Sequence, residues 1–203
     1  GGGISCMRSD AIIHSNTVTE NSAAGTGGGI AIKGYCHPII TNCTISENTA
    51  DIMGGGIAII DTSYPAITNT IFCADNAPIG PEIFVDDISW AVFTYCDIQG
   101  NWEGEGNIQA NPKFRDGKHG DFRLASEECG NHRNSPCIDA GDRQDPVGAE
   151  PLPNGKYINM GAYGGTAEAS KSPGNGRNIA DLTNDWAVDS NDLKVFVDYW
   201  LQE

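Results

Sequence analysis

The sequence is poor in basic residues. It holds 12 Lys and Arg against 27 Asp and Glu, which gives a net charge of −15 and an isoelectric point near 4.4. A surface of this sign repels DNA, RNA and anionic membranes, so we expect no nucleic-acid partner. It also disfavours polyanionic substrates such as pectate, unless calcium bridges the charges. The composition is compatible with calcium and with neutral glycans, although the same charge could serve solubility alone.

Long apolar runs are also missing. The longest aliphatic stretch is Ile57–Ile60, against the roughly 20 apolar residues that a membrane-spanning helix needs, so we expect no membrane insertion. The sequence shows neither a signal peptide nor an initiator Met, and it opens at Gly1 within a repeat. We therefore expect a secretion signal to lie upstream and the protein to work outside the cell or at its surface.

Helical periodicity is absent before residue 190. The chain contains 26 Gly and 10 Pro, a mixture typical of short strands joined by tight turns. A glycine-rich motif recurs at residues 1–4, 27–30 and 54–57, with a degenerate copy from Pro81, at spacings of 26, 27 and 27 residues. The runs that follow alternate, are β-branched and are broken by Gly, Pro, Asn and Asp, which argues against a helical repeat. The sequence therefore predicts an all-β parallel β-helix, a solenoid with about 27 residues per coil.

The period-2 alternation of a strand predicts which side chains enter the core. Ile30 and Ile32 point inward and Ala31 points outward, and equivalent residues of successive coils stack in columns. Four inward columns are predicted: Ile4, Ile30, Ile57 and Ile83; Cys6, Ile32, Ile59 and Val85; Ile13, Ile40, Ile67 and Phe93; and Val18, Ile45, Phe72 and Ile98.

Two corners of the coil are also predicted. Ser15, Asn42, Asn69 and Tyr95 mark one corner, where Asn tolerates a bent backbone and its amide bonds along the stack. The glycine triplets mark another, where they allow a positive φ or a close approach of the backbone.

The coils contain few candidate catalytic residues. Asp86, Asp87 and Asp97 could be acidic catalysts, but we expect them to be solvated charges at coil edges. Seven Cys allow at most three disulfides within the chain. Cys129 and Cys137 flank a polar loop and are candidate disulfide partners.

The regular repeat spans residues 1–101 and dissolves after them. Residues 102–169 are rich in Gly, Asn, Asp and Pro, and they predict irregular terminal coils that cap the solenoid, with strands near 113–115 and 121–124. Five segments follow one another in the order of one protein family: 95–100, 106–114, 120–124, 135–142 and 158–165. This succession resembles the secreted right-handed parallel β-helix proteins of planctomycete-type bacteria. The resemblance implies right-handed coils and an extracellular location more than a chemistry.

Residues 170–176 are typical of a flexible linker, and residues 177–203 predict a calcium loop followed by one short α-helix. Oxygen side chains fall at loop positions 1, 3, 5, 9 and 12, and position 7 offers its backbone carbonyl, which is the calcium spacing of an EF-hand. The expected Ca²⁺ ligands are Asp181, Thr183, Asp185, Ala187, Asp189 and Asp192.

The loop and its helix resemble half of a type I dockerin, which implies a cohesin-type partner. The apolar residues of the helix recur at helical spacing: Leu193, Phe196, Val197, Trp200 and Leu201. Three features depart from the family pattern, namely Thr183 in place of Asn, Trp186 in place of Gly, and the missing second loop–helix unit. The alternative is a helix capped by Asp189 or Ser190 that packs on the solenoid without calcium.

We expect a non-catalytic extracellular structural or binding protein. It would present a solenoid face to glycans, to the cell envelope, or to further copies of itself in filaments. The alternative is a non-catalytic or remnant part of a polysaccharide lyase or glycoside hydrolase with a dockerin-like anchoring module. A hydrolase needs two carboxylates across the scissile bond, and a lyase usually needs calcium with a basic residue, yet Arg8 and Lys33 are the only Arg and Lys before residue 101.

Overall fold

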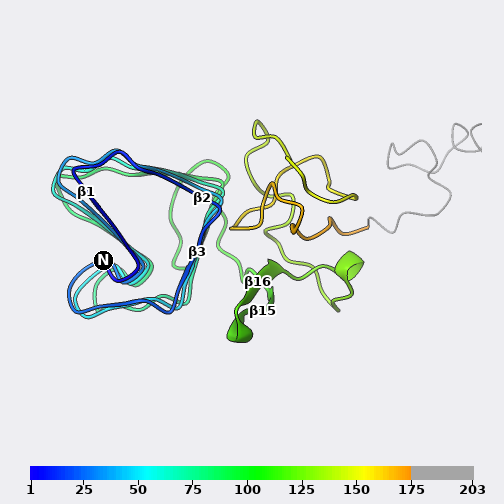
Figure 1. The fold of residues 1–203 in the computed structure, drawn as a ribbon, viewed down its shortest axis with the longest axis horizontal. Coiled ribbons are helices and arrows are strands. Elements are labelled where there is room, and N and C mark those ends of the chain that lie inside the picture. Colours follow the sequence, from blue (N-terminus) through cyan, green and yellow to red (C-terminus); the bar gives the residue numbers. More distant parts are fainter. Residues whose placement is uncertain (175–203) are drawn as a thin grey trace, which may run out of the picture. The chain divides into compact units, whose positions relative to one another are not determined.

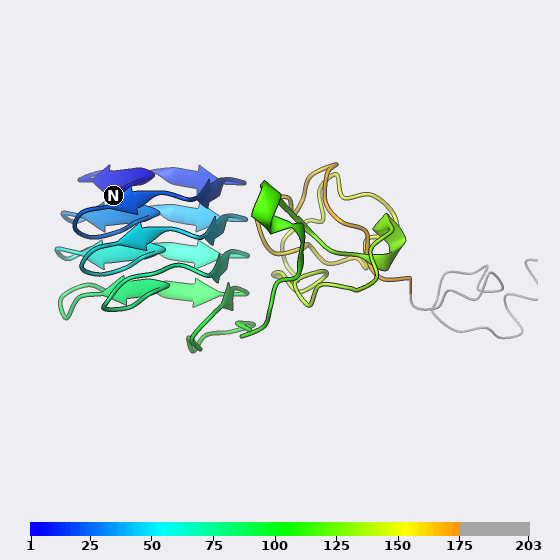
Figure 2. The same cartoon turned by 90° about the horizontal axis from the view of Figure 1, so that it is seen from below.

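The structure is a computed structural model that describes residues 1–174, of which residues 1–172 form one compact unit. Viewed down the axis of the solenoid, successive coils of the chain superpose (Figure 1), and from the side they lie in parallel layers (Figure 2). Sheet A contains β1 (Ile4–Met7), β5 (Ile30–Lys33), β9 (Ile57–Ile60) and β12 (Ile83–Val85). Sheet B contains β2 (Ile12–His14), β6 (Ile39–Thr41), β10 (Ala66–Thr68) and β13 (Val92–Thr94). Sheet C contains β3 (Thr17–Thr19), β7 (Thr44–Ser46), β11 (Ile71–Cys73) and β14 (Asp97–Ile98).

The four predicted inward columns are confirmed. Parallel pairing brings equivalent residues of neighbouring coils opposite one another in all three sheets. Except for the half-buried Ile4 and Val85, every side chain of these columns is buried. Coils about 4.8 Å apart thus cover one another's side chains. Removing each such aliphatic group from water stabilises the fold by roughly 1.5–3 kcal/mol.

The predicted corner at Ser15, Asn42, Asn69 and Tyr95 is confirmed in its backbone, because all four residues have φ between 48° and 54°. The expected direction of the amides is wrong. The Asn42 amide donates to the carbonyl of Asn159, and the Asn69 amide donates to Asp145, at 3.2 and 2.7 Å. These side chains leave the stack because a later part of the chain lies against this corner.

The ladder of amides expected at that corner occurs instead at another position of the coil. The Asn21 amide donates to Asn48 Oδ1 at 3.0 Å, and the Asn48 amide donates to Asp75 Oδ1 at 2.9 Å. Each backbone N–H of Asn21 and Asn48 also donates to the side-chain oxygen one coil along. We call these three residues the polar ladder. It lies next to β4 (Ser22–Ala23) and β8 (Thr49–Ala50), where it satisfies buried backbone groups.

The outer face of sheet A is covered by the chain itself. Ala31 and Ala58 lie on the opposite side of their strands from the inward isoleucines, yet they are 2% and 0% exposed. A Cβ on Gly27 would lie 2.8 Å from the Cα and Cβ of Ala31, and Gly27 has φ 68°. The glycine triplet is therefore needed because its backbone folds against the outer side of the strand. Ala31 points outward as predicted but is not exposed.

The outer face of sheet C is covered by residues 109–172, which we call the lateral cap. Ile71 and Cys73 flank the inward Phe72 on β11, and they form a second core with cap residues: Leu124, Cys137, Ile138 and Met160. The cap also donates to the corner of the coils, from Gly161 N to Asn69 O at 2.8 Å. These irregular residues thus pack against the side of the coils, whereas we expected them to finish their end.

The last coil is covered by a shorter segment. Trp102 packs on Phe93 with ring centroids 5.1 Å apart. The backbone N–H of Ile98 donates to Ile108 O at 2.9 Å, and that of Ile108 donates to Cys96 O at 2.8 Å. Residues 102–108 therefore cover the core and the edge of sheet C at this end of the stack.

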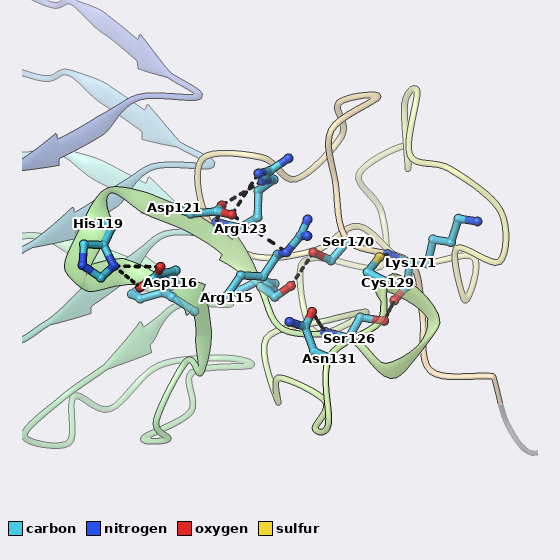
Figure 3. A network of polar contacts seen from close by, with 12 residues as sticks. Arg115, Asp116, His119, Asp121, Arg123, Ser126, Cys129, Asn131, Ser170 and Lys171 are labelled. Carbon is cyan, nitrogen blue, oxygen red and sulfur yellow. Dashed lines mark hydrogen bonds and ion pairs between the residues drawn. The ribbon is translucent and has the colours of Figure 1, made fainter.

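The lateral cap has little regular structure of its own. Its strands β15 (Phe114–Asp116) and β16 (Asp121–Leu124) pair antiparallel, near the predicted positions, around the short turn η1 (Gly117–His119). A second short turn, η2 (Glu127–Cys129), follows. Polar contacts stabilise the segment, among them a bidentate hydrogen bond from the Arg123 guanidinium to the Asp121 carboxylate (Figure 3). Ser170 and Ser172 are buried and hydrogen-bonded within the cap, so the linker expected from residue 170 does not include them.

The candidate disulfide between Cys129 and Cys137 is absent. Cys137 donates its thiol to Asp97 Oδ2 at 3.0 Å, and the Cys129 sulfur accepts the backbone N–H of Lys171 at 3.4 Å (Figure 3). All seven cysteines are free thiols, and six of them are buried.

We predict that replacing Asn48 by Ala destabilises the protein by roughly 2–4 kcal/mol, because several buried backbone groups lose their partner at once. Urea unfolding of the full chain measures this change. The matched control is Asn16→Ala, which removes an exposed amide with one bond to the carbonyl of His14. Equal losses in the two variants would contradict the role of the ladder.

We also predict seven alkylated cysteines per chain when the protein is unfolded in iodoacetamide without reductant. Intact-mass spectrometry counts the added groups. Five groups instead of seven would mean that one disulfide exists and that the thiol arrangement is wrong.

Candidate binding face

Sheet B differs from its two neighbours because no segment of residues 1–174 covers its outer face. The first outward position of its strands is held by Ile12, Ile39, Ala66 and Val92, which pair in register through the four coils. Ile12 is 76% exposed, and Ile39 and Val92 are about half exposed. Large aliphatic side chains in water, repeated in a row, are unusual on a soluble protein and indicate an interaction surface.

Aromatic rings extend this apolar row at the preceding corner. His37, Tyr64 and Trp90 occupy equivalent positions two residues before the row. The rings of His37 and Tyr64 stack at 5.4 Å with an angle of 18° between their planes. Trp90, in the last coil, is 68% exposed. The corner thus adds a broad aromatic surface to the aliphatic one.

The second outward position of sheet B is polar. It holds His14, Thr41, Thr68 and Thr94, and hydrogen bonds link His14 to Thr41 at 2.7 Å and Thr68 to Thr94 at 3.0 Å. An open groove of about 340 Å³ follows beside this row. Its walls are His14, Thr41 and Asn42 on the solenoid and, on the lateral cap, Asp145, Pro146, Gly148, Ile158 and residues 164–166. The whole surface, from the aromatic corner to the groove, is called the sheet B face below.

The sheet B face is amphipathic across its width. Neighbouring outward residues of a strand are about 7 Å apart and coils about 4.8 Å apart. Apolar and hydroxyl-bearing rows therefore run side by side over a surface roughly 14 Å in each direction. Such a surface can bind a molecule that has both an apolar flank and many hydroxyl groups.

The three acidic residues proposed from the sequence are not brought together. Asp87 is exposed and Asp86 partly so. Asp97 is 1% exposed, so the expectation of a solvated charge is wrong for it. It accepts the backbone N–H of Ala110 at 2.9 Å and the Cys137 thiol, and burial raises its pKa. Asp97 therefore fastens the lateral cap to β14.

Sequence reasoning missed one pair of acids that does meet. Asp75 and Glu82 are each 7% exposed and line a pocket of about 360 Å³ with Gln99, Asn101 and Trp102. Burial, together with contact with the Asp75 carboxyl, raises the pKa of Glu82 to about 9. Burial likewise raises the pKa of Asp75 to about 6. The sequence does contain a signal for this pair, because Asp75 replaces the Asn found at the equivalent position of earlier coils, and Glu82 replaces the equivalent Gly.

The predicted calcium ligands cannot be placed in space. Asp181, Thr183, Asp185, Ala187, Asp189 and Asp192 lie outside the described residues. Within residues 1–174, no group of three or more His, Cys, Asp or Glu side chains is arranged to hold a metal ion. The same part of the chain contains no helix long and apolar enough to cross a membrane.

Comparison with known proteins agrees with the coiled architecture. Searches of curated proteins and of solved structures returned no significant match. The family model described as "Right handed beta helix region" matches residues 1–113, which is more than half of the chain and includes all regular coils. The chain therefore belongs to the right-handed β-helix family.

Proposed function

We propose that the protein is a non-catalytic extracellular binding protein that holds a neutral polysaccharide on the sheet B face. The observation that carries the proposal is the in-register apolar row, exposed in a fold that covers the outer faces of sheets A and C. A β-helix domain is compatible with binding or degrading polysaccharides, and this face supports binding.

The chemistry of a sugar chain suits the two rows. A pyranose ring has a flat C–H surface that packs on aromatic and aliphatic side chains, and a rim of hydroxyl groups that needs hydrogen-bonding partners. Tyr64 and Trp90 with the aliphatic row supply the first, and Thr41, Thr68 and His14 supply the second. A net charge of −15 favours a neutral polysaccharide over a polyanionic one.

The arrangement of acids favours binding over hydrolysis. Glycoside hydrolysis needs two carboxyl groups on either side of the scissile bond, roughly 5–10 Å apart. The pair that does meet, Asp75 and Glu82, is buried at the end of the polar ladder and does not lie on the sheet B face. The same pair is the one feature that supports the alternative, a remnant of a polysaccharide lyase or hydrolase.

We further propose that the carboxy-terminal loop binds one Ca²⁺ and anchors the protein, through a cohesin-type partner or the cell envelope. The support is the sequence alone: the spacing of Asp181, Asp185, Asp189 and Asp192 with Thr183 and the Ala187 carbonyl. Self-association into filaments is less well supported, because residues 102–108 cover part of the last coil.

Replacing both Tyr64 and Trp90 by Ala should weaken binding to a soluble neutral polysaccharide at least tenfold, because exposed aromatic anchors dominate such surfaces. Affinity electrophoresis in gels that contain a galactomannan or a soluble cellulose derivative measures the change, and polygalacturonate serves as the polyanionic comparison. The matched control is Leu152→Ala, which removes a side chain 76% exposed on the lateral cap. Undiminished binding by the aromatic variant, or retardation of the parent by polygalacturonate alone, would refute the proposal.

Calorimetry of the full chain should show one bound Ca²⁺, and the double variant Asp181→Ala, Asp185→Ala should bind none. Asp87→Ala, which removes an exposed carboxylate from the solenoid, should bind like the parent. If the double variant still binds one Ca²⁺, the ligands lie elsewhere and the anchoring proposal loses its support.

A further inference from the structure

The third residue of the polar ladder carries a carboxyl group in place of an amide. Asn21, Asn48 and Asp75 stand at equivalent positions of three coils. The amide nitrogen of Asn48 donates to Ser46 O at 3.1 Å and to Val18 O at 2.8 Å, so this place in the coil needs a hydrogen-bond donor. Asp75 has an oxygen, Oδ2, where the asparagines have that nitrogen.

The position of Asp75 Oδ2 follows from its contact with glycine. A Cβ built on Gly29 would meet the Asn48 amide nitrogen at 2.9 Å, and one built on Gly56 would meet Asp75 Oδ2 at 2.6 Å. Asp75 Oδ2 is buried and has no hydrogen-bond partner within the described residues. An ionised carboxylate cannot donate a hydrogen bond, whereas a protonated one can take the place of the amide.

Glu82 ends the ladder in place of a further asparagine. Ile57 pairs with Ile83, so Glu82 stands one coil below Gly56. Its Oε2 accepts the backbone N–H of Asp75 at 3.4 Å, as Asp75 Oδ1 accepts that of Asn48. The Glu82 carboxyl is therefore bound to the backbone of Asp75, at the start of the fourth coil.

The charges around the pair all have the same sign. Interaction with the Glu47 carboxylate adds to the raised pKa of Asp75, and Asp75 and Glu82 in turn raise the pKa of the Cys73 thiol. The ion pairs of residues 1–174 all lie elsewhere and none includes Asp75 or Glu82. Two adjacent carboxyl groups without a cation hold a proton between them. The pocket beside Trp102 gives solvent access to that proton.

We infer that the Asp75–Glu82 pair is a proton-dependent latch that fastens the start of the fourth coil to the polar ladder. With the proton in place, the pair continues the ladder as an asparagine would. Without it, two negative charges repel each other in a buried place, and the inward orientation of Glu82 is no longer favoured. Residues 80–83 and the Trp102 wall of the pocket then loosen.

The direction of the pH effect follows from the raised pKa values. Both carboxyls bind protons more tightly in the folded chain than in the unfolded chain, where their ordinary pKa values are 3.8 and 4.5. The stabilising effect is therefore complete below about pH 4, and it is lost as pH rises through about 6 and about 9. Around neutral pH the latch weakens with every rise in pH.

The test is urea unfolding of the full chain at pH 6, 7 and 8, in the parent and in Glu82→Gln. Glu82 takes up about one proton on folding in this range. The ratio of the parent's unfolding constant to that of the variant should therefore rise about tenfold for each pH unit. The comparison cancels the contribution of Glu150, whose pKa burial raises to about 7 in both proteins. Asp87→Asn removes an exposed carboxyl of the same coil and should keep the parent's slope.

Hydrogen exchange locates the effect. After correction for intrinsic rates, peptides that cover residues 78–86 should exchange faster at pH 8 than at pH 6 in the parent, but equally in Glu82→Gln. A parent-like slope in the variant, or pH-independent protection of residues 78–86 in the parent, would overturn the latch. If Glu82→Gln fails to fold, the double variant Asp75→Asn, Glu82→Gln provides the same comparison, because it removes the same titrating group and restores at residue 75 the residue type that the ladder uses in the other coils.

Discussion

In-register parallel stacking is the interaction on which the rest of this structure depends. Each coil donates and accepts backbone hydrogen bonds along the axis, so a side chain at one position lies directly over its equivalents. Isoleucines then form continuous core columns, and the same rule creates the polar ladder and the outward rows of sheet B. A residue type that recurs at one position of each coil therefore forms a continuous row across several coils.

Covering of the outer faces decides which of these repeated rows can bind a ligand. The glycine corner covers sheet A, and the lateral cap covers sheet C through Ile71, Cys73 and the thiol–carboxyl contact of Cys137 with Asp97. Sheet B keeps an apolar row beside a hydroxyl row. The proposed binding role therefore rests on the face that the described residues leave uncovered.

The parts of the structure that obey the repeat were predictable from sequence. Columns such as Val18, Ile45, Phe72 and Ile98 follow from period-2 alternation within a 27-residue unit, and the positive φ of Asn42 and Asn69 follows from turn chemistry. Periodicity tells whether a side chain faces into its own coil. It does not tell what covers the outer side of sheet C, because that depends on distant residues such as Cys137 against Asp97 and Asp145 against Asn69.

The errors have this common origin. Asp97 was expected in solvent, but the cap returns to bury it, and the amides of Asn42 and Asn69 turn toward that cap. The Asp75–Glu82 contact was missed because each residue is unremarkable alone and departs from its column only when coils are compared. Acids placed where the fold uses neutral residues are candidates for function, since local rules are broken mainly where something is gained.

We propose the outer face of sheet B as the ligand-binding surface. Hydroxyl-radical footprinting of the full chain, with and without a neutral polysaccharide that it retains, tests this most directly. Oxidation of Trp90 and Tyr64 should fall on binding, while oxidation of the exposed Met7 and Leu152 should not change. Protection of Met7 or Leu152 with unchanged Trp90 and Tyr64 would contradict it and would place the ligand on another face.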